Sequence, residues 1–249
     1  MIDDRIAERR REVRQERRQR RLRRTVRVVV ALLVVAAFVV VERSPLVALA
    51  EVRIAGTERL SEEEVRDAAG LALGTSTLRL RLGEAEQRVA GLPLVADVIA
   101  RRIDPLTVEI EVREREPVLV AEGEDTHVLV DREGVVLLEA DLAGLPVIVL
   151  DHAPPAPGAH VDDDPALGNA HAAWRGLSGP LRAQVVRLHA AAEDQLTLEL
   201  ADGVEVRFGR ADRVDEKVRA LGAILEDVGT TPIEAIDVRA PRAPVVIGR

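Results

Sequence analysis

The chain has 249 residues, no cysteine and only three aromatic side chains. It therefore offers no disulfide framework, no thiol nucleophile and no thiolate metal site, and it lacks the stacked aromatic side chains on which readers of nucleic acids and glycans depend. The formal net charge is −8, yet residues 1–27 carry twelve arginines against five acidic residues, so the rest of the chain is strongly acidic.

An uninterrupted apolar run of fourteen residues, Val28 to Val41, follows the arginine-rich arm. At about 1.5 Å per residue the run covers only ~21 Å, whereas a membrane-spanning helix usually needs about 20 residues. Long basic side chains can extend to the lipid head groups, so we predict a single membrane helix over residues 26–44. Positive charge stays on the cytoplasmic side, which places tail 1–25 in the cytoplasm and the rest outside. Three arginines are expected at the membrane interfaces: Arg24, Arg27 and Arg43.

Two other interpretations of the apolar run stay open. Its length also suits a secretory signal, and Ala48-Leu49-Ala50 has the small-residue spacing that a signal peptidase recognises. A third possibility is a helix buried in a soluble core. The positive arm is unusually long for a signal peptide, which favours a retained anchor. Ser44-Pro45 ends the helix in each case.

The segment that follows predicts a small α+β unit. A strand at 51–54 leads into a turn at Gly56, and Ser61 with Glu64 forms a capping box at the start of a helix that Gly70 closes. A second helix is predicted over 80–90. Two strands follow, at 95–102 and 106–112, and the second alternates cleanly between apolar and polar residues. This order predicts a three-stranded sheet with two helices packed on one side.

The remaining sequence predicts a larger β-rich unit with helices. Turn residues separate most of its strands, including an Asp131-to-Gly134 hairpin turn. Helices are predicted over 165–177 and from Asp212 to about 228, and a proline-rich acidic loop over 151–164. Strands are predicted at 118–121, 127–130, 135–138, 145–150, 184–190, 196–200, 204–208 and 235–239.

The first unit resembles a POTRA domain, a fold that typically lies beside a membrane and mediates protein contacts. The whole chain from about residue 26 onward is similar to the FtsQ/DivIB family of bacterial cell-division proteins. The order and spacing of several short motifs carry this resemblance: residues 52–57, 60–65, 69–78, 92–96, 103–108 and 112–117, then the strand, Asp-x-x-Gly, strand entry at 127–138 and the proline-punctuated tail at 240–244.

The resemblance implies a domain plan and an α+β fold class. We expect an arginine-rich cytoplasmic tail over 1–25, a transmembrane helix over 26–44, a POTRA domain over 47–116 and a mostly antiparallel β domain with flanking helices over 117–249. The protein is then a single-pass type II protein of the plasma membrane, located at the division septum. Family members there link division proteins and couple their assembly to septal peptidoglycan synthesis.

The resemblance also implies a partner and a docking segment. In the family, the end of the β domain receives FtsB in complex with FtsL, and other septal proteins contact the POTRA domain or the membrane helix. The predicted last strand is a candidate sheet edge for strand addition, with Pro241 and Pro244 limiting aggregation. Some relatives place aromatic anchors along this segment, and this chain has none there. The matching residues are Asp237, Val238, Arg239, Ala240 and Arg242.

The sequence gives little support for an enzyme. It has four serines, none in a nucleophile-elbow pattern, and Ser61 is explained as a helix cap. His152, His160 and the acidic run 162–164 form the best metal-like cluster, but they share no fixed spacing and a solvated loop is the better interpretation. We therefore predict no catalytic, cofactor-binding or metal-ligating residue. The competing hypothesis is a cleaved, secreted POTRA module that acts in envelope assembly outside the divisome.

Overall fold

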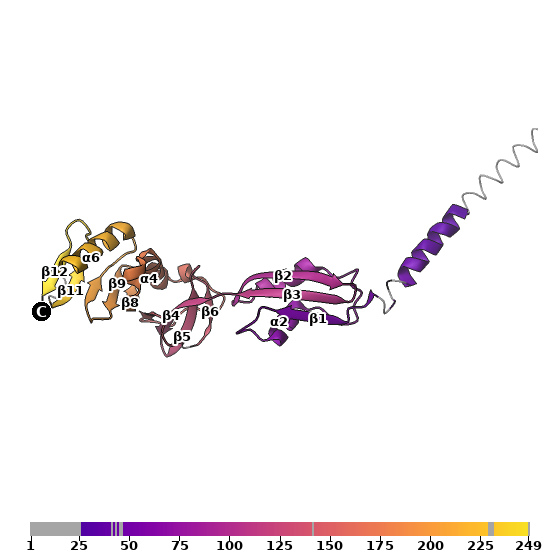
Figure 1. The fold of residues 1–249 in the computed structure, drawn as a ribbon, viewed down its shortest axis with the longest axis horizontal. Helices are drawn as coiled ribbons and strands as arrows, with labels where there is room; N and C mark the ends of the chain where they lie inside the picture. The colour runs from indigo at the N-terminus through magenta and orange to yellow at the C-terminus, as the bar shows by residue number, and fades with distance from the viewer. Residues whose placement is uncertain are drawn as a thin grey trace, which may run out of the picture.

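The computed structural model describes residues 26–40, 42, 44, 47–140, 142–228 and 232–248. Residues 26–40 form a helix at one end of an elongated molecule, followed by a three-stranded unit and then a larger sheet that carries the C-terminus (Figure 1). Among the described residues, no helix combines the length and apolar character needed to cross a bilayer. Arg27 lies exposed on this helix, whereas Arg24, Arg43 and the tail 1–25 fall outside the described residues.

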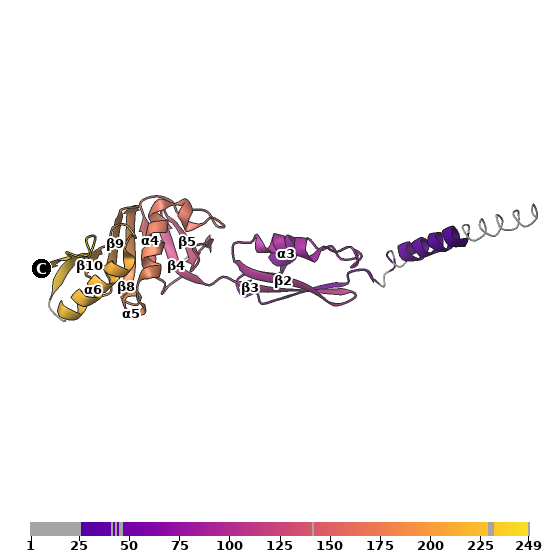
Figure 2. The ribbon, with the colours of Figure 1, turned by 90° about the horizontal axis from the view of Figure 1, so that it is seen from above.

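The three-stranded unit has the predicted order of elements. They are β1 (Glu51–Ala55), α2 (Glu62–Ala69), α3 (Leu82–Ala90), β2 (Val95–Asp104) and β3 (Thr107–Glu114). β3 lies in the centre, parallel to β1 and antiparallel to β2. Both helices lie on one face of this sheet (Figure 2). The predicted α+β arrangement of this unit is confirmed.

Local chemistry explains where the helices of this unit begin and end. The Ser61 hydroxyl accepts a hydrogen bond from the Glu64 backbone N–H, and the Glu64 carboxylate accepts one from Ser61 in return. This capping box satisfies donors that the first helical turn leaves unpaired. Gly70 ends α2 in the left-handed conformation, as predicted. The apolar faces of the helices then pack on the sheet through Val65, Ala69, Ala85 and Val89.

The larger unit contains a nine-stranded sheet of order β12-β11-β10-β9-β8-β7-β4-β5-β6. Five neighbouring pairs are antiparallel and three are parallel, so the predicted mostly antiparallel domain is confirmed. The strands are β4 (Pro117–Gly123), β5 (Thr126–Asp131), β6 (Val136–Glu139), β7 (Val147–Leu150), β8 (Val185–Ala192), β9 (Gln195–Leu200), β10 (Glu205–Arg207), β11 (Ile233–Asp237) and β12 (Val245–Gly248). The helices are η2 (Val161–Asp163), α4 (Pro165–Gly176), α5 (Gly179–Arg182) and α6 (Val214–Val228).

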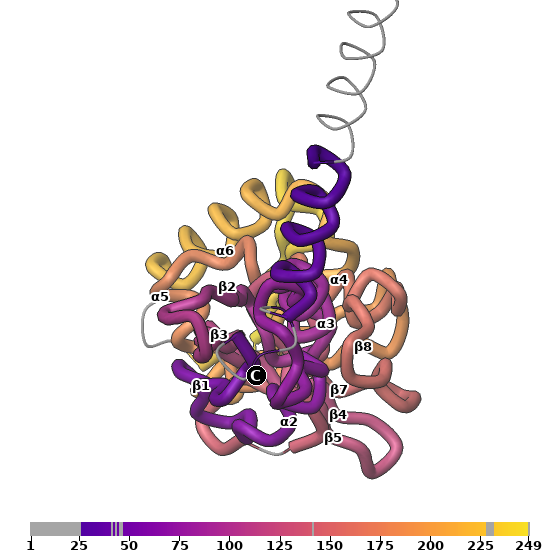
Figure 3. Tube along the Cα trace, turned by 90° about the vertical axis from the view of Figure 1, so that its right-hand side faces the viewer, coloured from indigo at the N-terminus to yellow at the C-terminus, as the bar shows by residue number. Residues whose placement is uncertain are grey.

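The strands nearest the three-stranded unit are buried on both faces. One face of β4 and β5 packs into the main core with α4, through residues such as Leu119 and Val130. The opposite face forms a second cluster that includes Leu94 of the three-stranded unit with Val120 and Leu129. Seen from the end that carries the helix, the three-stranded unit lies in front of the larger domain (Figure 3). An apolar contact therefore joins the two units.

The C-terminal edge of the large sheet differs from the prediction. The predicted last strand, β11, lies inside the sheet, because β12 pairs with it antiparallel in the register Ile236 to Val246 and Asp237 to Val245. β12, a short strand directly after Pro244, was not predicted from the sequence. The prediction that residues 236–239 form the terminal sheet edge is therefore wrong.

Candidate partner-binding site

The C-terminal end of the large sheet is formed by three short strands, β10, β11 and β12. β11 runs parallel to β10, which requires a crossover, and α6 supplies it. β12 then returns antiparallel on the outer side of β11 and is the last strand of the sheet among the described residues. Its outer backbone groups have no neighbouring strand there, which makes β12 the free edge at this end.

Two of the predicted docking residues form a surface ion pair at the end of β11. The Arg239 guanidinium donates hydrogen bonds to both carboxylate oxygens of Asp237, with Nε to Oδ1 at 3.0 Å and Nη2 to Oδ2 at 2.5 Å. The hydrogen bond and charge of Arg239 hold the pKa of Asp237 below its usual value. Surface pairs contribute little to stability, so this pair mainly fixes the side-chain positions at the strand end.

The other three predicted residues have different environments. Val238 is fully buried, and its backbone N–H donates to the Arg207 carbonyl at 3.0 Å, so its side chain supports the core. Ala240 is exposed in the turn before β12. Arg242 is exposed and lies 3.6 Å from the Glu216 carboxylate of α6. The structure thus brings exposed polar groups together beside β12, and their role in binding stays a prediction.

The free edge itself carries apolar side chains that were not among the predicted docking residues. Val245 is 55% exposed and Val246 is 42% exposed. Successive strand residues point to opposite faces, so the edge offers one exposed valine on each face. The signal was present in the sequence as a short β-branched run, Val245-Val246-Ile247, after the proline-rich turn.

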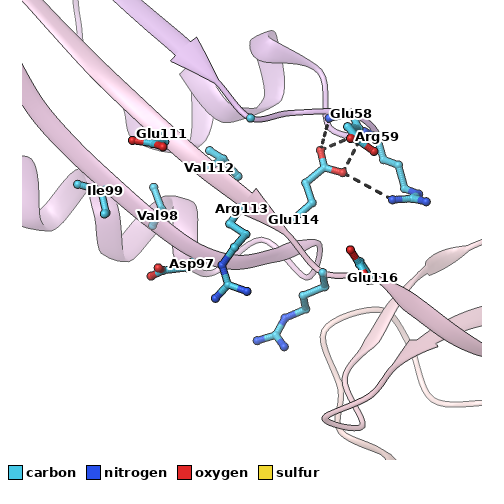
Figure 4. A pocket seen from close by; sticks show the side chains of 12 residues that line it. Glu58, Arg59, Asp97, Val98, Ile99, Glu111, Val112, Arg113, Glu114 and Glu116 are labelled. Carbon is cyan, nitrogen blue, oxygen red and sulfur yellow. Dashed lines mark hydrogen bonds and ion pairs between the residues drawn. The ribbon is translucent and has the colours of Figure 1, made fainter.

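A second surface feature is a groove of about 420 Å³ on the three-stranded unit, near the larger domain (Figure 4). Acidic and basic side chains from β2, β3 and the loop after β1 line it. Its lining combines five carboxylate side chains with three guanidinium groups. The groove is therefore a charged surface feature in which acidic and basic groups are interspersed.

One carboxylate that lines this groove, Glu114, is held by backbone hydrogen bonds. Glu114 accepts hydrogen bonds from the N–H groups of Glu58 at 2.8 Å, Arg59 at 3.0 Å and Leu60 at 2.9 Å. Dashed lines in Figure 4 mark its interactions with Glu58 and Arg59. Burial raises the pKa of Glu114, but these backbone hydrogen bonds lower it more, so the net shift is downward. Glu114 thus holds the loop before α2 and is not free to act on a ligand.

The residue after Glu114 joins the two units. Arg115 donates from Nε to the Val95 carbonyl at 3.2 Å and from Nη1 to the Asp131 carboxylate at 2.7 Å. Asp131 is buried, and its other oxygen accepts the N–H groups of Gly134 at 2.8 Å and Val135 at 2.7 Å. The Asp-x-x-Gly hairpin predicted from sequence therefore serves as an anchor point between the units.

The loop at residues 151–164 contains the histidines and aspartates that resembled a metal site in the sequence. In the structure, its Asp164 is engaged in contacts that support the fold. Asp164 caps α4 through the N–H groups of Ala166 and Leu167 and contacts the His152 ring. Burial raises the pKa of Asp164, while hydrogen bonds from Leu167, His152 and Ala166 bring it below its usual value. Among the described residues, no group of three or more histidine, aspartate or glutamate side chains is arranged to hold a metal ion.

Comparisons with known proteins agree with this two-unit plan. A family model described as POTRA domain, FtsQ-type, matches residues 47–115, and one described as Cell division protein FtsQ/DivIB, C-terminal, matches residues 118–239. Proteins named Cell division protein FtsQ are similar to this chain. Those from Mycobacterium leprae and Mycolicibacterium smegmatis are 33% and 34% identical over 82% and 87% of this chain, which spans 57% and 62% of their lengths. The one from Streptomyces venezuelae is 32% identical over 79% of this chain and 73% of its own.

Proposed function

The chain belongs to the FtsQ/DivIB family of bacterial cell-division proteins, and we propose on that basis that it is a non-enzymatic assembly protein of the division machinery. It is held in the plasma membrane by the helix around residues 26–44, with the N-terminus in the cytoplasm and both folded domains outside. At the septum it recruits the FtsB and FtsL pair and couples this assembly to septal peptidoglycan synthesis.

The free edge of β12 is the observation that carries the docking proposal. A partner strand that pairs with β12 gains main-chain hydrogen bonds, and side-chain contacts on alternating faces give it specificity. The exposed Val245 and Val246 supply apolar contact on the two faces of that edge. The ion pair of Asp237 with Arg239 and the exposed Arg242 lie next to the start of β12. These groups suit a partner segment that carries charges beside its strand.

The lead-in to β1 supports a retained anchor over a cleaved signal. Leu49 is buried in the core of the three-stranded unit, and it exchanges backbone hydrogen bonds with Gly74 and Thr75, both at 2.8 Å. Cleavage after Ala50 would therefore remove a core residue from the folded domain. Membrane fractionation with an intact-mass measurement tests this part, and a mature N-terminus at Glu51 would refute the tether.

The docking proposal is tested with a double variant of the edge. Val245→Asp with Val246→Asp adds charge where a partner strand would pair, and both side chains are exposed, so the domain should stay folded. We expect capture of the FtsB and FtsL pair by the full chain to weaken about tenfold or more. The matched control is Val186→Asp, an exposed valine of β8. Unchanged capture by the folded edge variant would exclude β12 as the docking strand.

A further inference from the structure

Three large apolar side chains are exposed at the end of the first domain from which the N-terminal helix leaves. Leu73 is 64% exposed, Leu78 is 57% exposed and Ile103, near the end of β2, is 41% exposed. Leu73 and Leu78 belong to the loop at residues 71–80, between α2 and α3. Exposed apolar side chains that gather at one place on a soluble domain commonly mark an interaction surface.

Hydrogen bonds hold this loop against two other segments. The Thr77 N–H donates to the Val47 carbonyl at 2.7 Å, and its buried hydroxyl donates to the Pro105 carbonyl at 2.8 Å. Gly74 and Thr75 bond the backbone of Leu49. The loop at 71–80, the lead-in at 47–50 and the turn between β2 and β3 therefore form one structure, which we call the helix-side tip. Its leucines are held outward by a fixed backbone.

The helix-side tip lies close to the end of the apolar helix. The Arg79 guanidinium forms an ion pair with Glu42, which is helical and lies just beyond residues 26–40 in the chain. Five residue steps separate Glu42 from Val47, so the chain between them spans at most about 18 Å. Figures 1 and 2 show the helix leaving from this end of the three-stranded unit. The helix also exposes large apolar side chains, including Leu32, Leu33 and Phe38.

We propose that the helix-side tip rests in the interfacial layer of the membrane that holds the helix. Leu73, Leu78 and Ile103 enter the boundary between head groups and acyl chains. The exposed arginines Arg79 and Arg81 lie at the level of the phosphates. The proposal rests on the membrane tether of the proposed function. It adds a second lipid contact that fixes how the first domain is oriented on the membrane surface.

Apolar contact, more than lipid charge, drives this docking. Arg79 pairs with Glu42 and Arg81 pairs with Glu84 at 2.7 Å, so each arginine is partly neutralised before it meets lipid. Attraction to anionic lipid depends on net basic charge near the surface. The tip should therefore dock on zwitterionic phosphatidylcholine as well as on mixtures that contain phosphatidylglycerol.

The absence of cysteine from the chain gives a clean labelling experiment. Single variants Leu73→Cys and Leu78→Cys are labelled with an environment-sensitive fluorophore in the full chain, reconstituted in nanodiscs of phosphatidylcholine with or without phosphatidylglycerol. We expect emission from both sites to shift to shorter wavelength and to be quenched by lipids that carry a spin label near the head group. The control Val186→Cys, an exposed site on β8 of the other domain, should show neither effect.

The outcomes separate this inference from the proposed function. In the first outcome, the protein resists extraction by alkaline carbonate, but the probes at residues 73 and 78 behave like the probe at residue 186. That result would overturn the inference and leave the tether intact. A blue shift that appears only after the FtsB and FtsL pair is added would also overturn it, in favour of a protein contact. Chain that carbonate removes from the membrane would contradict the tether and the inference together.

Discussion

Lys217 is the only lysine of the chain, and it is almost completely buried, with 1% of its surface exposed. Its ammonium donates to the carbonyls of Phe208 at 3.0 Å and Arg210 at 2.6 Å and to the Asp212 carboxylate at 2.8 Å. It also lies 5.1 Å from the centre of the Phe208 ring. A compact ammonium with three donors fits this site, whereas the wider planar guanidinium does not.

We expect Lys217→Met and Lys217→Arg to destabilise the β domain. The methionine variant leaves buried carbonyl groups without a donor, at a cost of about 1–3 kcal/mol. The arginine variant keeps the charge but overpacks the site, at a cost of about 1–3 kcal/mol. Urea unfolding followed by Trp174, the only tryptophan, measures the effect. Arg219→Met, an exposed substitution on the same helix, is the control and should change stability little.

We expect the stability of the β domain to depend on pH through His171. Burial lowers the pKa of His171 below its usual 6.5, and its ring hydrogen-bonds the Asp131 carbonyl at 3.2 Å. The folded protein therefore keeps a neutral ring where the unfolded chain takes up a proton, so stability should fall as pH drops below about 6.5. The His171→Gln variant should not lose stability in this pH range. The His189→Gln variant, changed at an exposed histidine, is the control and should still lose it.

Carboxylates set a separate window at lower pH. The pKa values of Glu114 and Asp164 are lowered in the folded protein from usual values of 4.5 and 3.8. Their stabilisation is present above those values and is lost as pH falls through the lowered ones. If the His171→Gln variant still loses stability between pH 5 and 6.5, a group other than His171 must take up the proton in that range.

At the scale of elements, the turn after β1 depends on a glycine. Gly56 has φ of +84°, and an added Cβ would lie 2.0 Å from the Val112 carbonyl oxygen of β3. Gly74 provides a matched control, because it has φ of +83° and no atom within 4 Å of an added Cβ. The two positions separate backbone strain from a steric clash.

We expect Gly74→Ala to cost about 1–2 kcal/mol, the usual penalty for a left-handed alanine. Gly56→Ala should cost roughly 1–3 kcal/mol more, because β1 or β3 must shift to relieve the clash. Hydrogen exchange of the β1 and β3 amides measures the effect, which should be confined to the first domain. Equal losses in the two variants would mean that the turn can move away from β3 without cost.

Elements with their own local signals were predictable from sequence, and those fixed by distant contacts were not. The Ser61 capping box and the alternation in β3 are local, and both appear where predicted. β12 is only four residues long, and its local signal is limited to the β-branched run Val245-Val246-Ile247. That run does not reveal the pairing with β11, which is a tertiary contact. The strand predicted to form the sheet edge, β11, therefore lies one strand inside that edge. The burial of Val238 likewise depends on the assembled sheet.

At the scale of the molecule, the joint between the domains sets where β12, the proposed docking edge, lies relative to the helix. The domains follow one another along an elongated axis, with β12 at the end opposite the helix (Figure 1). The joint combines Arg115 with a small apolar cluster that contains Leu94 and Leu129. Because the cluster covers one face of β4 and β5, it also completes the burial of those strands. A fixed joint would hold the proposed docking edge at a constant distance from the proposed membrane anchor.

We expect Arg115→Ala to loosen this joint and to leave β12, the proposed docking edge, in place. The change takes the cation from Asp131, which is 1% exposed on its side chain. Two backbone N–H groups still bind that carboxylate. We therefore expect the free energy of unfolding to fall by roughly 2–4 kcal/mol, which is less than for a buried charge left without any partner. Spin labels at Leu78→Cys and Val186→Cys place one label on each domain. The distribution of distances between them should therefore broaden when the joint loosens.

Arg113→Ala is the control for this experiment, since Arg113 is an exposed arginine two residues earlier on β3. It should leave the distance distribution narrow. Capture of the FtsB and FtsL pair by Arg115→Ala should stay near that of the unmodified chain, because β12 is remote from the joint, while complementation of division should weaken. A distance distribution that stays narrow in Arg115→Ala would assign the rigidity of the joint to the apolar cluster. Leu94→Ala should then produce the broadening instead, since it removes the side chain that the first domain packs against Leu129.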